Sequence, residues 1–104
     1  MKLNCDVPNL IENFPNCIEE LVLDFNFDME LNNLPTSIRK IIFNRYSKYN
    51  RELNCLPNSV VFLQLLETYY KKISHLPSEL KIIHCSKKYK YVKDFVDLIV
   101  INYE

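Results

Sequence analysis

The chain has 104 residues, 48% of them hydrophobic and 25% charged, with no glycine, no alanine and a net charge of zero. This length allows one domain, and the composition is that of a globular rather than a disordered protein. Phosphate-binding loops and dinucleotide-binding turns are excluded, because both need glycine where the backbone approaches a phosphate. No apolar run approaches the ~20 residues of a membrane span and the start does not resemble a signal peptide, so we expect a cytoplasmic protein outside the membrane.

The charges are distributed unevenly along the chain. Residues 1–33 hold one lysine against seven acidic residues, whereas residues 34–104 hold twelve basic against six acidic residues. Such asymmetry indicates either a basic binding surface or the two ends of an elongated molecule.

A repeat of 20 to 22 residues runs through the chain. It is marked by four prolines that each follow a large apolar residue, namely Pro15, Pro35, Pro57 and Pro77. Further apolar residues stand three, six and eight positions after each proline, as Val60, Leu63 and Leu65 do after Pro57. The alternation at the end of the unit is typical of a short strand with one buried face, and the proline, which cannot donate a ladder hydrogen bond, precedes that strand.

One such unit cannot bury its own apolar face, so the units are expected to stack into a parallel sheet over one continuous core. The predicted fold class is an α/β leucine-rich-repeat solenoid, with short parallel strands on the concave face and a mostly irregular or short-helical convex side. We divide this single domain into an N-terminal partial unit or cap at 1–10, four repeats at 11–30, 31–52, 53–72 and 73–91, and a short C-terminal unit at 92–104. In the last unit Val96, Ile99 and Ile101 are assigned the buried positions.

The repeats resemble FNIP repeats, which are leucine-rich-type repeats known mainly from amoebae and the large DNA viruses that infect them. The resemblance rests on the aromatic-Asn pair Tyr49-Asn50 and on the Leu-Pro-x-Ser-Ile/Val segments at 34–38 and 56–60, and it extends over residues 11–85. Two other units depart from the pattern with Phe27-Asp28 and Tyr69-Tyr70, and no unit has the glycine that usually follows the strand.

The resemblance implies a binding module. FNIP proteins often join the repeats to an F-box that recruits a ubiquitin ligase, but only about ten residues precede the first full unit here. The resemblance therefore implies a binding module without its usual effector. If the protein is viral, this module would act in the host cytoplasm. Only Asn26 occupies the consensus asparagine position after the strand, so the buried asparagine ladder of leucine-rich repeats is not expected. Asparagine and aspartate, such as Asn44, are expected to make the turns in place of glycine.

Alternate strand residues are expected to point outward and to align between units, with Glu20 beside Lys40. The predicted partner-binding residues are Val22, Lys40, Ile42, Phe62, Gln64, Leu66, Ile82 and His84. Among them Phe62, Leu66 and Ile82 would form an apolar centre with polar neighbours, which is typical of an interface. The sequence thus predicts noncatalytic recognition of a protein partner, although scattered apolar residues on a sheet face can also have no function.

The last strand suggests self-association. Residues 97–103 are apolar and lack proline, so Leu98, Val100 and Asn102 are assigned to an open edge that could pair with a second copy to give a homodimer. The alternatives are that this strand docks back on the chain or that the charges around it protect it.

No catalytic, metal or cofactor site is predicted. The four cysteines have no C-x-x-C spacing, and Cys85 occupies a core position. His84 and Cys85 are consecutive in a strand and point to opposite faces, so they do not form a nucleophile and base pair. Cys55 and His75 occupy equivalent places in neighbouring units, but two further metal ligands cannot be named.

Nucleic-acid binding is the alternative function. Residues 86–93 interleave four lysines with two tyrosines, as in a stretch that contacts phosphates and stacks on bases. A second basic region consists of Arg39, Lys40, Arg45, Lys48 and Arg51. The zero net charge and the expected position of these residues on convex loops argue against this alternative.

Overall fold

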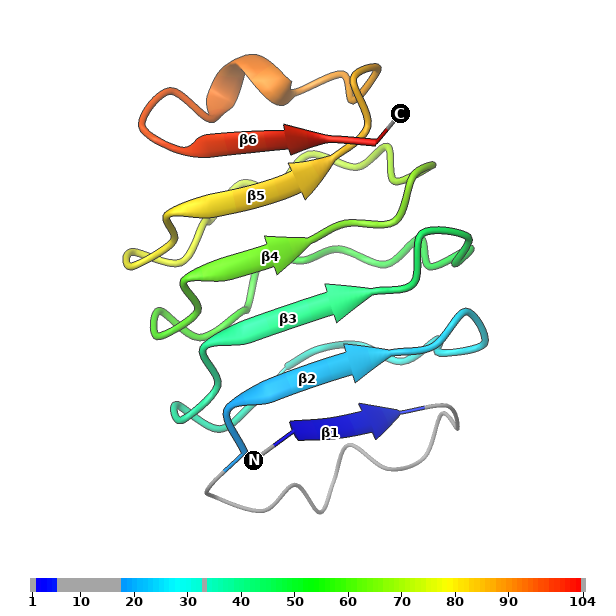
Figure 1. Ribbon diagram of the computed structural model, residues 1–104, viewed down its shortest axis with the longest axis vertical. Helices are drawn as coiled ribbons and strands as arrows, with labels where there is room; N and C mark the ends of the chain where they lie inside the picture. The colour runs from blue at the N-terminus through cyan, green and yellow to red at the C-terminus, as the bar shows by residue number, and fades with distance from the viewer. Residues whose placement is uncertain (1, 6–17, 33, 104) are drawn as a thin grey trace.

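The chain forms a solenoid built on one parallel sheet. A computed structural model describes residues 2–5, 18–32 and 34–103. Its strands stack in chain order, and between β2 and β6 the backbone returns behind the sheet after each strand (Figure 1). They are β1 (Lys2–Cys5), β2 (Glu20–Leu23), β3 (Lys40–Phe43), β4 (Phe62–Gln64), β5 (Ile82–Cys85) and β6 (Ile99–Asn102).

The expected parallel solenoid is confirmed, but its helical part is smaller than an α/β class implies. Within the described ranges the only helical segment is the 3₁₀ helix η2 (Val92–Asp94), and the rest of the returning chain consists of turns and irregular backbone. None of these residues belongs to a helix with the length and apolarity needed to cross a bilayer.

The sheet has the register that the repeat predicts. Glu20 lies beside Lys40, and Leu21 lies beside Ile41. Along β2 the even-numbered residues are partly exposed, whereas Leu21 and Leu23 are fully buried. Because successive strand residues point to opposite faces, the repeat places one row of apolar side chains in the core at each turn.

A hydrogen-bonded turn precedes strands β3, β4 and β5, and it explains the Leu-Pro motif. The carbonyl oxygens of Pro35, Pro57 and Pro77 each accept a hydrogen bond from the N–H three residues later, at 3.1 to 3.3 Å. The donors Ile38, Val60 and Leu80 are all buried. Proline therefore starts the turn with its carbonyl group, and its missing N–H is not needed there.

A second turn follows each of the strands β2 to β5 and is made without glycine. The backbone bonds from Phe27 to Asp24 and from Ser47 to Asn44 measure 3.0 and 3.1 Å. The Asn44 side chain also accepts a hydrogen bond from the Tyr46 N–H at 2.9 Å. Such turns suit Asp, Asn and Ser at their first position, because the short polar side chain bonds the backbone two residues on.

The core lies between the sheet and the returning chain, and a column of aromatic rings runs through it. Phe27 stacks on Tyr49 with ring centroids 5.9 Å apart, and Tyr69 stacks on Tyr89 at 6.3 Å. Phe95 closes the column beyond Tyr89 at 5.7 Å. All five rings are buried in the same core cluster.

The buried tyrosines and partly buried serines tie each unit to the one before it. The Tyr49 hydroxyl donates to the Met29 carbonyl oxygen at 2.9 Å, and the Tyr89 hydroxyl donates to that of Lys71. Ser37 and Ser59 donate to the carbonyl oxygens of Ile18 and Ile38 at 2.6 and 2.7 Å. These two ladders satisfy backbone oxygens inside the solenoid in the way that the asparagine ladder does in regular leucine-rich repeats.

The register of the last unit differs from the sequence prediction by one residue. β6 pairs with β5 so that Ile99 lies beside Ile82 and Ile101 beside His84, on the outer face. The inward positions belong to Phe95, Leu98 and Val100, which bury or partly bury their side chains against the core. Assigning Val96, Ile99 and Ile101 to the core was therefore wrong, and a shift of one residue exchanges every inward and outward side chain of a strand.

Candidate functional site

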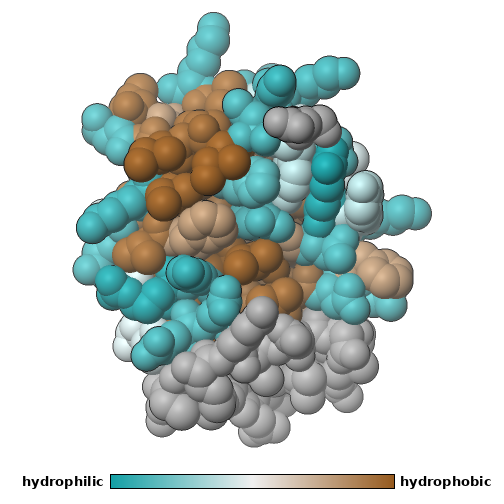
Figure 2. Space-filling view, in the orientation of Figure 1, coloured by the Kyte–Doolittle hydropathy of each residue, from teal (hydrophilic) through white to brown (hydrophobic). Residues whose placement is uncertain are grey.

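The outer face of the sheet carries an oblique apolar band. The band consists of Val22, Ile42, Phe62, Ile82 and Ile99. Val22 lies beside Ile42, Phe62 beside Ile82, and Ile82 beside Ile99. Ile42 and Phe62 are diagonal neighbours, since Ile42 pairs with Gln64 two residues further along β4. Figure 2 shows this band as brown and tan atoms crossing the sheet between teal flanks.

Polar side chains border the band on both sides. Glu20 and Lys40 flank it near the starts of the strands, and Gln64 and His84 flank it near their ends. The predicted residues Val22, Lys40, Ile42, Phe62, Gln64, Ile82 and His84 therefore share one face. All of them are at least partly exposed.

Leu66 does not belong to this face. Its side chain is only 1% exposed and lies in the core cluster. β4 ends at Gln64, so the strict alternation stops there, and Leu65 and Leu66 are both buried. The expectation that Leu66 points to the outer face was therefore wrong.

The open edge of the sheet presents other side chains than the sequence predicted. Leu98 and Val100 pack against the core, whereas Ile99 and Ile101 are 63% and 42% exposed on the outer face. The Ile99 N–H donates to Lys81, so the alternate N–H groups, those of Val100 and Asn102, point away from β5. β6 has a strand neighbour on one side only, and the apolar band ends at this edge.

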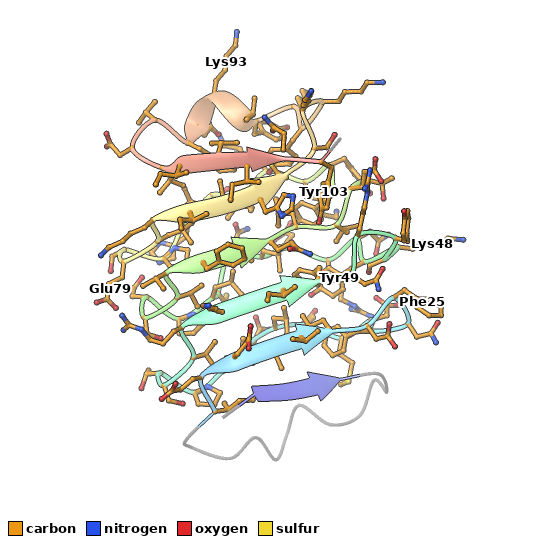
Figure 3. All side chains as sticks on the ribbon, in the orientation of Figure 1. Phe25, Lys48, Tyr49, Glu79, Lys93 and Tyr103 are labelled. Atoms are coloured by element: carbon orange, nitrogen blue, oxygen red, sulfur yellow. The ribbon has the colours of Figure 1, made fainter. Side chains whose placement is uncertain are left out.

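A polar network beside the band holds the chain after β6 in place. The Tyr103 hydroxyl donates to the Leu65 carbonyl oxygen at 2.7 Å, and the His84 ring stacks on the Tyr103 ring at 4.1 Å. The Arg45 guanidinium lies over the Tyr103 ring, 4.8 Å from its centroid, and forms an ion pair of 2.9 Å with Glu67. Figure 3 labels Tyr103 on this side of the sheet, where the strands end.

The network sets the protonation of its members. Burial and the nearby Arg45 lower the pKa of His84, so its neutral form is favoured. The hydrogen bond from Arg45 lowers the pKa of Glu67. Burial raises the pKa of Tyr103 to about 12. No sequence pattern pointed to this network, because its members come from four units and meet only when the units stack.

The described residues offer no cluster of three or more histidine, cysteine or acidic side chains that could hold a metal ion. Cys55 is an exposed free thiol and Cys85 a buried one, and burial raises the pKa of Cys85. His84 points to the outer face while Cys85 points into the core, as the strand alternation predicts. Cys5 and Cys17 lie outside the part of the chain whose side chains the structure describes.

The two basic regions differ in how their charges are paired. The arginines of the first region all have acidic partners: Arg39 lies 4.0 Å from Glu79, and Arg51 lies 3.0 Å from Asp28. Arg45 is paired with Glu67. In contrast, the lysines of residues 86–93 form no ion pair with any residue that the structure describes.

Comparison with known proteins agrees with the repeat. Residues 25–68 match the family model of the FNIP repeat. Searches of curated proteins and of solved structures found no match. The matched segment contains β3 and β4 with the turns before and after them, and it has the period that continues through β5. The resemblance to FNIP repeats that the sequence indicated is therefore supported over residues 25–68.

Proposed function

We propose that the chain is a noncatalytic protein–protein interaction module and that it binds its partner through the concave, sheet side of the solenoid. The observation that carries the proposal is the apolar band. It crosses five strands on a face that no other part of the described chain covers. An apolar surface bordered by polar side chains is typical of a binding interface.

The size of the band fits a specific contact. Neighbouring strands lie roughly 4.8 Å apart, so a band from β2 to β6 extends over roughly 20 Å. Strands of about four residues extend roughly 13 Å, so the loops around the sheet would also contribute to the roughly 800 Å² that each partner buries in a standard interface. Phe62 is the only aromatic residue of the band and lies at its centre, where the residues that contribute most to affinity are usually found.

Affinity capture from a candidate host cytosol tests the proposal. The variant Phe62→Glu/Ile82→Glu places two charges in the middle of the band and leaves the core rows Leu63 and Ile83 intact. We expect it to lose the partner that the wild type captures. A matched control, Phe25→Glu/Val96→Glu, introduces the same charges at exposed apolar residues outside the band.

The control variant is expected to capture the same partner as the wild type. Circular dichroism on both variants establishes that the solenoid is retained. If the band variant is folded and still captures the partner, the sheet side is not the binding face. If the control variant loses the partner as well, added charge rather than the band explains the loss.

A further inference from the structure

A groove lies where the chain leaves β4 and β5, beside rather than on the outer sheet face. We call it the exit groove. It has a volume of about 710 Å³ and is lined by residues 67–70, residues 86–91 and Tyr103. Pockets of roughly 300 to 1,000 Å³ are typical of ligand sites. Most of the lysine- and tyrosine-rich segment 86–93 therefore lines this groove.

The exit groove carries uncompensated positive charge. Lys87, Lys88 and Lys90 line it, are exposed and form no ion pair with the described residues. Its one lining carboxylate, Glu67, is already bound by Arg45 at 2.9 Å. A ligand in the groove therefore meets lysines whose charge is not neutralised by the protein, unlike the arginines of the other basic region.

Two of the tyrosine rings that line the groove lie next to lysine side chains. Tyr70 is 60% exposed, and the Lys71 ammonium group lies 5.4 Å from its ring centroid. The ring of Tyr91 has the ammonium groups of Lys72 and Lys90 at 6.0 and 5.5 Å. The groove thus offers two tyrosine rings, each next to at least one cation.

We propose that the exit groove binds single-stranded nucleic acid, with backbone phosphates on Lys87, Lys88 and Lys90 and bases stacked on Tyr70 and Tyr91. A single strand is the ligand in which anionic phosphates alternate with flat unpaired bases at short intervals, and such ligands are bound by basic grooves with aromatic platforms. In a duplex the base faces are covered by their neighbours and cannot stack on these rings. The lysine side chains contact the phosphates, since no glycine lets the backbone approach them closely.

Fluorescence anisotropy with a labelled oligothymidylate and a labelled oligouridylate, over a salt series, tests this proposal. Wild-type affinity is expected to fall with salt. The variant Lys87→Gln/Lys88→Gln should make the slope of log affinity against log salt less steep by about 1.4, because each phosphate contact on a single strand contributes about 0.7. Both lysines are exposed, so the fold does not depend on them.

Two further variants test whether bases stack on Tyr70 and whether the salt dependence comes from the groove lysines rather than from any exposed cation. Tyr70→Leu is expected to weaken binding by about tenfold and to leave the salt slope unchanged, because a stacked base is lost but no charge. The control Arg39→Gln/Lys81→Gln removes two exposed cations before β3 and β5, at the other end of the strands, and should leave the slope at the wild-type value.

Several results would overturn the proposal. They are no salt-dependent binding of either strand, equal binding of a duplex, unchanged affinity of Tyr70→Leu, and a slope reduced as much by the control as by the lysine variant. Equally effective competition by a mononucleotide would identify a free nucleotide as the ligand instead, and binding of an acidic peptide without the oligonucleotides would identify a protein ligand. The variant Phe62→Glu/Ile82→Glu should keep wild-type affinity for the strand, so this proposal and the sheet-side function can fail separately.

Discussion

The Tyr69 hydroxyl donates a hydrogen bond of 2.9 Å to the carbonyl oxygen of Arg51, eighteen residues earlier in the chain. Tyr49 and Tyr89 form the same kind of bond one unit before and one unit after. Burial raises the pKa of all three hydroxyls, so they stay protonated and able to donate. This ladder explains how a repeat without the consensus asparagines satisfies the carbonyl oxygens of its returning chain.

Removing one hydroxyl from the ladder should destabilise the protein without changing its packing. We expect Tyr69→Phe to lower the free energy of unfolding by about 1 to 3 kcal/mol, because the Arg51 oxygen loses its partner in a partly buried place. Urea denaturation followed by circular dichroism measures this change. Tyr70→Phe is the matched control, since its ring is exposed and its variant should unfold at the wild-type midpoint. Equal midpoints for both variants would contradict a structural role of the ladder.

The burial of Leu66 is testable in the same way. Leu66→Ala should reduce the free energy of unfolding by about 2 to 5 kcal/mol, as for other buried leucines that leave a cavity. Ile99→Ala, which truncates an exposed residue, should change it by no more than about 0.5 kcal/mol. A small effect of Leu66→Ala would place its side chain on the surface, as the sequence alone suggested.

Stability should depend on pH through His84. Burial and Arg45 lower the pKa of this histidine in the folded state, whereas in the unfolded state it returns to its usual value of 6.5. Below that value the unfolded chain binds more protons, so stability is fully present above about pH 6.5 and falls as pH decreases toward the lowered pKa. Thermal melts between neutral and mildly acidic pH should show this loss, and His84→Gln should reduce it. An NMR titration that gives His84 an unshifted pKa would reject this explanation.

Self-association through β6 remains a prediction, and the observed register identifies the N–H groups that would form the contact. The free N–H groups of Val100 and Asn102 can pair with the β6 strand of a second copy, which would join the two apolar bands across the contact. We expect light scattering to give a mass that rises toward twice 12.5 kDa with concentration. Asn102→Pro removes one of these N–H groups and should keep the protein monomeric, because that group is not used by β5. A wild-type monomer at every concentration would rule out the edge contact.

The sequence predicted the regular units and failed where regularity ends. The Leu-Pro motif and the spacing of Val60, Leu63 and Leu65 were sufficient for the strands, their register and their buried faces, since these depend on local pattern and stacking. β6 was shifted because its unit is shorter, and both Phe95 with Leu98 and Val96 with Ile99 fit the apolar spacing. Only packing of Phe95 on Tyr89 decides between them.

The hydrogen bonds between side chains and backbone groups of different units share one direction. In some of these bonds the side chain donates, as the Ser59 hydroxyl does to the Ile38 carbonyl oxygen. In others it accepts, as the Asn54 side chain does from the Ser74 N–H. Among the described residues the donor belongs to the later unit in both cases. During synthesis on the ribosome, a unit that emerges therefore finds the acceptors for these particular bonds already made. Folding can thus follow translation from β2 toward β6, and each completed turn serves as the template on which the next one settles.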